Sequence, residues 1–242
     1  LTKSIAVNAG QRLLNDLSIE HKKYVHSDEF PKEVKALADT VLEQDILKSL
    51  SSTGFPILSE EAGYISGQSE SKYWFIVDPL DGTFNFIKGL GPCAVSIAFW
   101  EEQKPIFGVI YDIYSQELYW GGEKFGAYCN GNKISVSNTL NKKNASICTG
   151  FPVRFNTQNN DEMQNFWNLI SPYAKVRMLG TAAISLINVA KGSADVYTEQ
   201  SIMLWDVAAG IAIIEGSGGC IYSEKGPHEY SLNVFASNKT LF

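Results

Sequence analysis

The chain has 242 residues, of which 45% are hydrophobic and 19% are charged, and its formal net charge is −6. This length and composition are typical of a globular protein with one large domain or two closely packed ones. A negative net charge without a long basic segment argues against a nucleic-acid interface, and no apolar segment is long enough to span a membrane. The four cysteines lie far apart without a Cys-x-x-Cys pair, so we expect reduced thiols in a cytoplasmic protein.

The first half of the chain is predicted to be an α+β unit, with helices followed by strands. Apolar residues recur at helical spacing in residues 1–22 and 34–50, and the polar segment 24–31 between them is expected to be a mobile loop. A second polar loop is expected at 62–72. Apolar runs of strand length stand at 55–58, 74–77, 93–100, 106–111 and 117–120. The last three runs are expected to form an antiparallel meander, which a hairpin turn at Asn130-Gly131 would extend.

In the second half, predicted strands and helices alternate, which indicates α/β layering. Strands are predicted at 146–149, 176–179, 194–197, 219–222 and 233–236. Helices are predicted at 161–169, 181–190 and 206–215. Because no Pro-, Gly- or Ser-rich linker divides the chain, we expect residues 1–242 to form a single unit with an N-terminal half, about 1–140, and a C-terminal half, about 141–242.

Two acidic residues follow the apolar run at 74–77. Asp78 comes directly after this run, and Asp81 follows after Pro79 and Leu80. Pro79 has no amide hydrogen and a restricted φ, so it is expected to end the strand and stiffen the turn. The turn therefore carries two carboxylates, which are hard anionic ligands.

Gly82 and Thr83 come directly after the second acid. This pair is suited to begin a helix, whose first backbone N–H groups have no partner within the helix and bind anions. Two carboxylates beside such an anion site suit cations together with a phosphate group.

Further acids stand at predicted strand ends and helix starts. Glu60 and Glu61 follow the strand at 55–58, and Asp206 begins the apolar helix at 206–215. Each acid taken alone is more typical of a solvated turn residue, and Asp206 alone fits a helix N-cap. Several converging carboxylates would repel one another unless cations lay between them, and all-oxygen ligands suit Mg²⁺ or Mn²⁺. The pattern therefore favours a metal site.

Haloacid-dehalogenase phosphatases also place two aspartates after a buried strand, and their first aspartate is a covalent nucleophile. In those enzymes a single residue separates the two acids, whereas two residues separate Asp78 from Asp81. The spacing in this chain argues against the covalent mechanism.

Three motifs together resemble the signatures of the inositol monophosphatase superfamily. They are Glu60-Glu61, Asp78-Pro79-Leu80-Asp81-Gly82-Thr83 and Trp205-Asp206-Val207-Ala208-Ala209-Gly210. The similarity continues through residues 180–183 and 194–199 and spans about residues 34–237. The resemblance implies a layered αβαβα sandwich of the inositol monophosphatase and fructose-1,6-bisphosphatase type.

The resemblance also implies two or three bound Mg²⁺ ions, with Mn²⁺ as an alternative. One ion would be held by Glu60, Asp78 and the backbone carbonyl of Leu80. A second would be held by Asp78, Asp81 and Asp206. Two ions in such positions clamp the attacking and leaving oxygens of a phosphoryl transfer.

The other catalytic roles follow from the same resemblance. Glu60 and the hydroxyl of Thr83 would orient and deprotonate the attacking water, while the backbone N–H groups of Gly82 and Thr83 would bind phosphate oxygens. Glu61 would support these groups from outside the metal site. We expect Asp39 to be a helix-surface acid, and the alternative is another carboxylate near the metals.

The leaving alcohol would contact Asp81, Ala182 and Glu199, which match substrate positions of the family. For Glu199 the alternative is a solvated loop acid. Residues 180–183 are similar to those of inositol or sugar monophosphatases, whereas the nucleotide-bisphosphate branch tends to have Gly-Ser-Ser there. Members active on inositol commonly carry His at the position of Met203, so the identity of the polyol stays open.

The sequence therefore predicts a phosphoric monoester hydrolase that uses Mg²⁺ to cleave inositol monophosphate or a sugar phosphate by direct attack of water. The alternatives are a 3′(2′),5′-bisphosphate nucleotidase, a fructose-1,6-bisphosphatase or, in a different class, a non-catalytic regulatory protein. The resemblance further implies lithium sensitivity and a homodimer. The cysteine usage, charge and hydropathy favour a cytoplasmic protein with no nucleic-acid or membrane partner. His21, His26 and His228 lack metal-binding spacing and are expected to be surface or packing residues.

Overall fold

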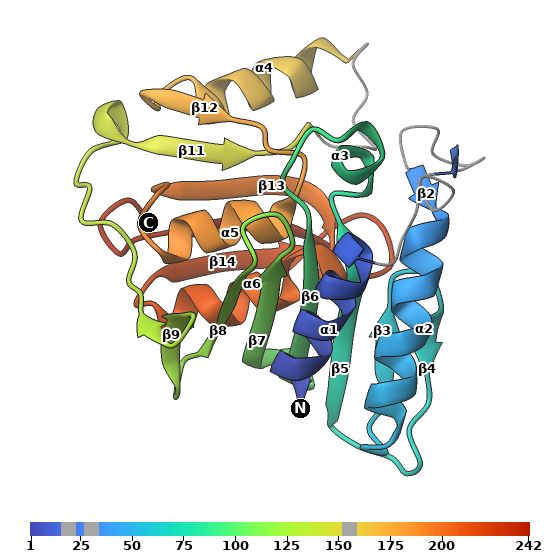
Figure 1. The fold of residues 1–242 in the computed structure, drawn as a ribbon. Helices are drawn as coiled ribbons and strands as arrows, with labels where there is room; N and C mark the ends of the chain where they lie inside the picture. The colour runs from blue at the N-terminus through green and yellow to red at the C-terminus, as the bar shows by residue number, and fades with distance from the viewer. Residues whose placement is uncertain (16–22, 27–33, 152–158) are drawn as a thin grey trace.

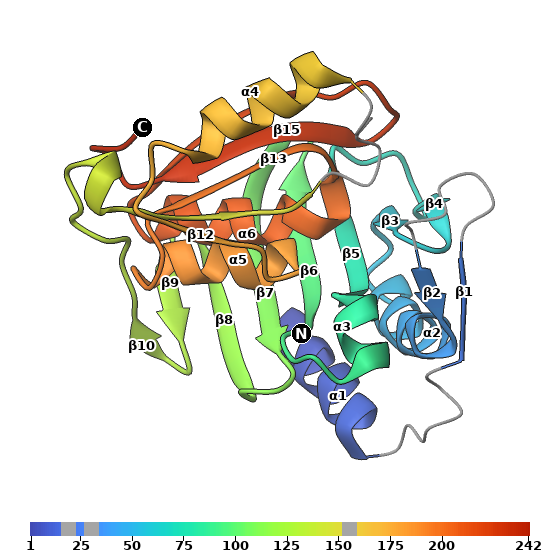
Figure 2. The same ribbon diagram turned by 90° about the horizontal axis from the view of Figure 1, so that it is seen from above.

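A computed structural model describes residues 1–15, 23–26, 34–151 and 159–242. The helices span Thr2–Asn15 (α1), Leu37–Ser51 (α2), Thr83–Lys88 (α3), Asn160–Ile170 (α4), Ala182–Ala190 (α5) and Leu204–Gly216 (α6). Five layers stack in the order α1 and α2, an eight-stranded sheet, α5 and α6, a five-stranded sheet, and α4 (Figure 1 and Figure 2). This arrangement confirms the predicted αβαβα sandwich.

The eight-stranded sheet is built from the first half of the chain. Its strands span Ile57–Ser59 (β3), Gly63–Ile65 (β4), Tyr73–Asp81 (β5), Ala94–Glu101 (β6), Lys104–Asp112 (β7), Glu117–Gly122 (β8), Gly126–Cys129 (β9) and Asn132–Lys133 (β10). Their order is β10-β9-β8-β7-β6-β5-β3-β4, and β3 runs parallel to β5. Strands β5 to β10 are antiparallel neighbours, which confirms the predicted meander and its hairpin turn at residues 130–131.

The five-stranded sheet is built from the second half. Its strands span Ser146–Thr149 (β11), Lys175–Arg177 (β12), Val196–Met203 (β13), Cys220–Lys225 (β14) and Ser231–Ser237 (β15). Their order is β12-β11-β13-β15-β14, with β11 parallel to both of its neighbours. Helices α4 and α5 form the crossovers between these parallel strands, as the alternating pattern predicted (Figure 2).

Apolar side chains fill the spaces between the layers. Helices α1 and α2 cover one face of the eight-stranded sheet with residues such as Leu42 and Ile46. Helices α5 and α6 cover its other face and also contact the five-stranded sheet. Because both helices lie between two sheets, nearly all their residues are buried and neither has a polar face.

The structure corrects several predicted boundaries in the first half. The polar segment 62–72, predicted as a loop, contains β4. The segment 24–31 contains a short strand, β1 (Tyr24–His26), which pairs with β2 (Val34–Ala36), and its remaining residues lie outside the described part of the chain. Helix α1 is described from Thr2 to Asn15, and the rest of the predicted helix, including His21, also lies outside the described residues, so its end stays a prediction.

The four cysteines are free thiols, as the sequence predicted. Burial raises the pKa of Cys93 and of Cys148, so both thiols stay protonated near neutral pH. In the described part of the chain, no helix is long and apolar enough to cross a membrane.

Candidate active site

An irregularity in β5 places two acidic side chains on one face of the eight-stranded sheet. Asp78 pairs with Ser96 and Asp81 pairs with Ala94, so β5 has one residue more than β6 between these two pairs. Side chains alternate between the faces of a regular strand, and an extra residue shifts that alternation by one. The prediction that Pro79 ends the strand is wrong, because the strand continues through this bulge to Asp81.

The packing on the two faces of β5 shows the same shift. Val77 and Leu80 belong to the core formed with α1 and α2, whereas Ile76 belongs to the core formed with α5 and α6. Asp78 and Asp81 consequently point to the same side as Ile76. Both carboxylates therefore face the helices in the middle of the sandwich.

Asp206 reaches this site from helix α6. The helix begins at Leu204, two residues before the predicted start, so Asp206 is its third residue and not its N-cap. Oδ2 of Asp206 accepts a hydrogen bond from the backbone N–H of Met203 at 3.3 Å. Carboxylate oxygens of Asp78, Asp81 and Asp206 all lie within 4.8 Å of one another.

Glu60 and Glu61 stand in the turn after β3, and a buried residue of α2 holds this turn. Glu43 is 5% exposed, and its Oε1 accepts hydrogen bonds from the backbone N–H groups of Glu61 and Ala62 at 3.1 and 3.0 Å. The same oxygen accepts a hydrogen bond from the hydroxyl of Ser59. Glu43 was not among the predicted site residues. It could have been found as an acidic residue within the apolar stripe of a predicted helix.

Asp39 is buried beside Thr83, so the prediction of a helix-surface acid is wrong. Its side chain is 1% exposed, and Oδ2 accepts a hydrogen bond from the backbone N–H of Ala36 at 2.8 Å. The hydroxyl of Thr83 lies 2.8 Å from Oδ1 of Asp39 and 3.0 Å from the carbonyl oxygen of Leu80, so either oxygen accepts its single proton. Burial is the main reason that the pKa of Asp39 rises to about 7.

Gly82 makes the turn from β5 into α3. Its φ is +91°, in the left-handed region, and a Cβ there would lie 3.0 Å from the carbonyl oxygen of Pro92 and 3.2 Å from Cβ of Cys93. Both the conformation and the lack of space require glycine. The carbonyl of Gly82 accepts a hydrogen bond from the backbone N–H of Phe86, so Gly82 and Thr83 do begin a helix, as predicted.

Asp81 accepts hydrogen bonds from the start of helix α5. Its Oδ2 accepts hydrogen bonds from the hydroxyl of Thr181, the N-cap of this helix, and from the backbone N–H of Ala183 at 2.7 Å. Ala182, which was predicted to contact substrate, is the first residue of α5 and is 6% exposed. These bonds join the acids of the first half of the chain to the second half.

Burial and mutual repulsion disfavour the ionised forms of the clustered acids. Burial, and then repulsion between neighbouring carboxylates, raises the pKa values of Glu60, Asp78 and Asp206. Burial raises the pKa of Asp81 to about 6. Oδ2 of Asp78 is buried and has no hydrogen-bond partner in the described part of the chain. A cation would satisfy this oxygen and remove the repulsion, and the all-oxygen donor set fits Mg²⁺ or Mn²⁺.

Comparison with known proteins identifies the family. The sequence model of the inositol monophosphatase family matches residues 2–239. The chain belongs to this family. It is 33% identical, over 98% of its length, to a protein of Aquifex aeolicus named fructose-1,6-bisphosphatase/inositol-1-monophosphatase, 89% of which is covered. It is also 32% identical, over 94% of its length, to Nus factor SuhB of Pasteurella multocida, 86% of which is covered.

A solved structure confirms the fold of the inositol monophosphatase family. The extragenic suppressor protein suhB of Bartonella henselae matches this structure with a TM-score of 0.85 and 32% sequence identity. The match covers 98% of this chain and 92% of that one.

The structure gathers most of the residues that the family resemblance assigns to the metals. Asp78, Asp81 and Asp206 lie together, and the charge of Asp206 contributes to the raised pKa of Glu60. The side chain of Leu80 is buried in the core, and its carbonyl lies beside the Thr83 hydroxyl described above. Their roles as metal ligands stay predictions of the family resemblance.

Glu199 stands on a strand and not in a loop, because β13 continues to Met203. Its carboxylate accepts a hydrogen bond from the hydroxyl of Tyr197 at 3.1 Å. Burial and, to a smaller extent, the charge of Asp81 raise the pKa of Glu199 to about 7. Glu199 therefore lies close enough to Asp81 for the charge of that carboxylate to raise the pKa of Glu199.

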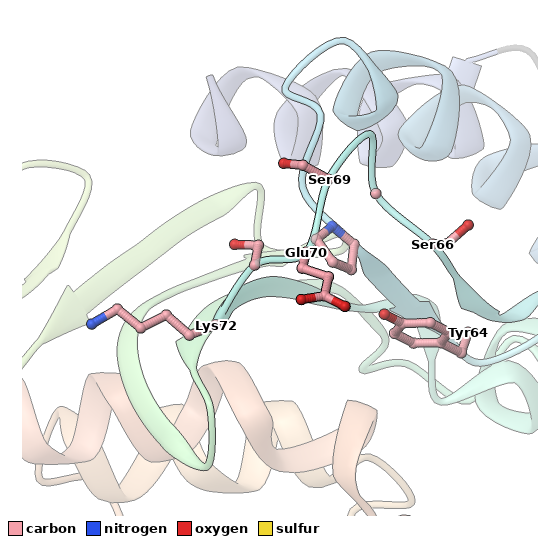
Figure 3. Close-up of a pocket in the computed structure, with 8 residues that line it drawn as sticks. Tyr64, Ser66, Ser69, Glu70 and Lys72 are labelled. Carbon is pink, nitrogen blue, oxygen red and sulfur yellow. The ribbon is translucent and has the colours of Figure 1, made fainter.

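A separate cleft of about 650 Å³ lies at the other end of β5 (Figure 3). Its lining comes from the residue before β3, from β4 and from the segment between β4 and β5, and consists of Pro56, Tyr64, Ser66, Gly67, Ser69, Glu70, Ser71 and Lys72. At about 3.3 Å per strand residue, Lys72 lies roughly 20 Å along the strand from Asp78. This cleft contains none of the acids that the family resemblance assigns to the metals.

Proposed function

We propose that the protein is a Mg²⁺-dependent phosphomonoesterase that hydrolyses a small polyol or sugar phosphate by direct attack of water. The observation that carries the proposal is the convergence of Asp78, Asp81 and Asp206 within 4.8 Å, with Oδ2 of Asp78 buried and without a hydrogen-bond partner in the described residues. Two divalent cations that hold a phosphate need such oxygen ligands. The family and the names of its members support the same activity.

The residues of the proposed metal site divide into two overlapping sets. Glu60, Asp78 and the carbonyl of Leu80 would hold one ion, and Asp78, Asp81 and Asp206 would hold the second. When bound, the ions supply electrostatic stabilisation of the charge that develops on the phosphate oxygens. Hydrogen bonds to the starts of α5 and α6 hold Asp81 and Asp206 in place, so these carboxylates are preorganised.

Asp39 and Thr83 are proposed to accept the proton of the attacking water. When the hydroxyl of Thr83 donates its proton to Asp39, the Thr83 oxygen can accept a proton from water. A carboxyl whose pKa is raised to about 7 is a suitable final acceptor near neutral pH. Glu60 would orient the same water, and Glu61 would support it. The backbone N–H groups of Gly82 and Thr83 would contact the phosphate oxygens.

Release of inorganic phosphate from inositol 1-phosphate, fructose 1,6-bisphosphate and 3′-phosphoadenosine 5′-phosphate tests the proposal. We expect hydrolysis of the first or second compound, its loss in EDTA and its recovery on addition of Mg²⁺. Asp81→Asn should remove most of this activity while circular dichroism shows an intact fold. Near wild-type turnover in Asp81→Asn would overturn the two-metal assignment. Preference for the third compound would move the substrate to the nucleotide class.

A non-catalytic regulatory role is the second candidate, and the names of relatives such as Nus factor SuhB favour it. In that case the acidic cluster would bind a cation only for stability. A pure, folded protein that binds Mg²⁺ but hydrolyses none of the three compounds would support this role over the phosphatase.

Three further properties are proposed, the first two from family membership and the third from the free cysteines. They are inhibition by lithium, a homodimeric state and a cytoplasmic location. Phosphatase assays with added LiCl, light scattering of the purified protein and cell fractionation test them in turn.

A further inference from the structure

The carboxylate of Glu199 is held from one side by a residue of its own strand. Tyr197 stands two residues earlier on β13, so the two side chains lie on the same face of the sheet. The hydroxyl of Tyr197 donates a hydrogen bond to Oε2 of Glu199 at 3.1 Å. The Tyr197 side chain is fully buried in the core around α5 and α6. Its packed ring gives the hydroxyl a single position, and this hydrogen bond therefore fixes one carboxylate oxygen.

Gly150 holds the same carboxylate from the neighbouring strand. It follows Thr149, the last residue of β11, which pairs with Thr198 of β13. A Cβ on Gly150 would lie 2.2 Å from Oε1 of Glu199 and 2.5 Å from Oε2. The backbone of Gly150 also donates a hydrogen bond to this carboxylate. Gly150 does not have a positive φ, so no special backbone conformation requires glycine at this position. Glycine is required there because a side chain would occupy the space of the Glu199 carboxylate.

The held carboxylate belongs to the same buried region as the acidic cluster. The charge of Glu199 contributes to the raised pKa of Asp206, and the charge of Asp81 contributes to that of Glu199. The phenol of Tyr197 experiences the charges of all three acids, and its pKa is raised chiefly by burial. Tyr197 therefore stays protonated and acts as a donor.

We propose that Tyr197 and Gly150 are positioning residues, which hold Glu199 as a fixed acceptor for a hydroxyl group of the leaving alcohol; this rests on the proposed phosphatase function. A fixed acceptor discriminates between substrates, because an alcohol without the hydroxyl leaves a desolvated carboxylate unpaired. A carboxylate that is free to turn would lose this discrimination. Substrate selectivity then depends on two residues that do not themselves contact the substrate.

Selectivity is measured as the ratio of kcat/KM for the preferred polyol or sugar phosphate to kcat/KM for phenyl phosphate, whose leaving group has no further hydroxyl. Tyr197→Phe, Gly150→Ala and Glu199→Gln should each lower this ratio about tenfold or more, mainly through KM of the hydroxylated substrate. Tyr222→Phe is the matched control, because its hydroxyl donates to Glu224 at 2.8 Å with the same two-residue spacing on the exposed strand β14. This control should leave the ratio unchanged.

A double variant separates positioning of Glu199 from a general structural role. Tyr197→Phe in a Glu199→Gln background should cause no further fall in the ratio, because its effect passes through the Glu199 carboxylate. A further tenfold fall would overturn the proposal. An unchanged ratio in Tyr197→Phe and Gly150→Ala, with a lowered ratio in Glu199→Gln, would also overturn it.

Crystal structures of the two single variants provide a readout besides activity. An alanine at position 150 meets the flexible end of Glu199, so the carboxylate should move by about 1 Å or more while the fold stays intact. A wild-type protein that hydrolyses no phosphate ester contradicts the proposed function. A carboxylate that stays in place in both Tyr197→Phe and Gly150→Ala contradicts the positioning, whatever the activity.

Discussion

Asp78 and Asp81 point to the same side of β5 because the strand holds one extra residue between them. In a regular strand, residues three positions apart point to opposite faces, and one of the two carboxylates would lie in the core beneath α2. The bulge brings both acids toward Asp206 and leaves Leu80 in the core. With two residues between the two acids, the bulge is therefore a structural requirement of the site.

Deletion of both Pro79 and Leu80 should destroy the cation site. Asp78 and Asp81 would then be adjacent residues of β5, and adjacent residues of a strand point to opposite faces. We expect the rise in melting temperature on addition of Mg²⁺ to disappear. Deletion of Pro79 alone is the control, because it removes the extra residue and leaves the two acids two positions apart on the same face, so the Mg²⁺ response should remain. A Mg²⁺ response that survives the double deletion would show that the common face of the two acids is not needed.

Asp39→Asn should lower kcat by about 100-fold with little change in the Mg²⁺ concentration that gives half-maximal activity. Asparagine keeps the size of the side chain but cannot take up the proton that Thr83 passes on. Thr83→Val should have a similar effect, and Thr83→Ser, which keeps the hydroxyl, should retain most activity. If kcat of Asp39→Asn equals that of the wild type, Asp39 only fastens α2 to the turn before α3.

Without divalent cations, the protein should lose stability as the pH rises from about 4 to about 7. The pKa values of Asp39 and Glu199 are raised to about 7, mainly by burial. The folded state binds these protons more tightly than the unfolded state. The free energy of unfolding therefore falls as the pH rises from the unfolded-state pKa of these groups to their folded-state pKa, and it levels off above about pH 7. Melting temperatures in EDTA should decrease across this range, and less so in Asp39→Asn.

Addition of Mg²⁺ to the same samples should raise the melting temperature most at the alkaline end, where the carboxylates of the cluster are ionised and repel one another. A melting temperature that increases with pH in EDTA would contradict the raised pKa values.

Glu43→Ala should lower the free energy of unfolding by about 3 kcal/mol, because the buried Ser59 hydroxyl and the N–H groups of Glu61 and Ala62 lose their acceptor. Urea unfolding measures this loss. Gln44→Ala, at an exposed position of the same helix, is the control and should change stability by less than about 0.5 kcal/mol. A loss no larger than the control's would mean that water replaces Glu43 as acceptor.

Much of the architecture could be predicted because local patterns and burial agree. Helix α6 is apolar on all sides, and a helix of this kind must lie between two other layers. The alternation of strands and helices after residue 146 likewise requires parallel strands with helical crossovers. Boundaries were less accurate at β5 and at the start of α6, because pairing with β6 and the bond from Met203 to Asp206 extend both elements.

The sequence by itself determined which acids were available and in what order, since the motifs around Asp78 and Asp206 are local and specific. Only the tertiary structure decided which groups meet. Asp39 and its partner Thr83 are 44 residues apart, so no local pattern could reveal that Asp39 is buried. The common face of Asp78 and Asp81 depends on a single unpaired residue in the ladder with β6, and pairing between strands is a property of the folded chain.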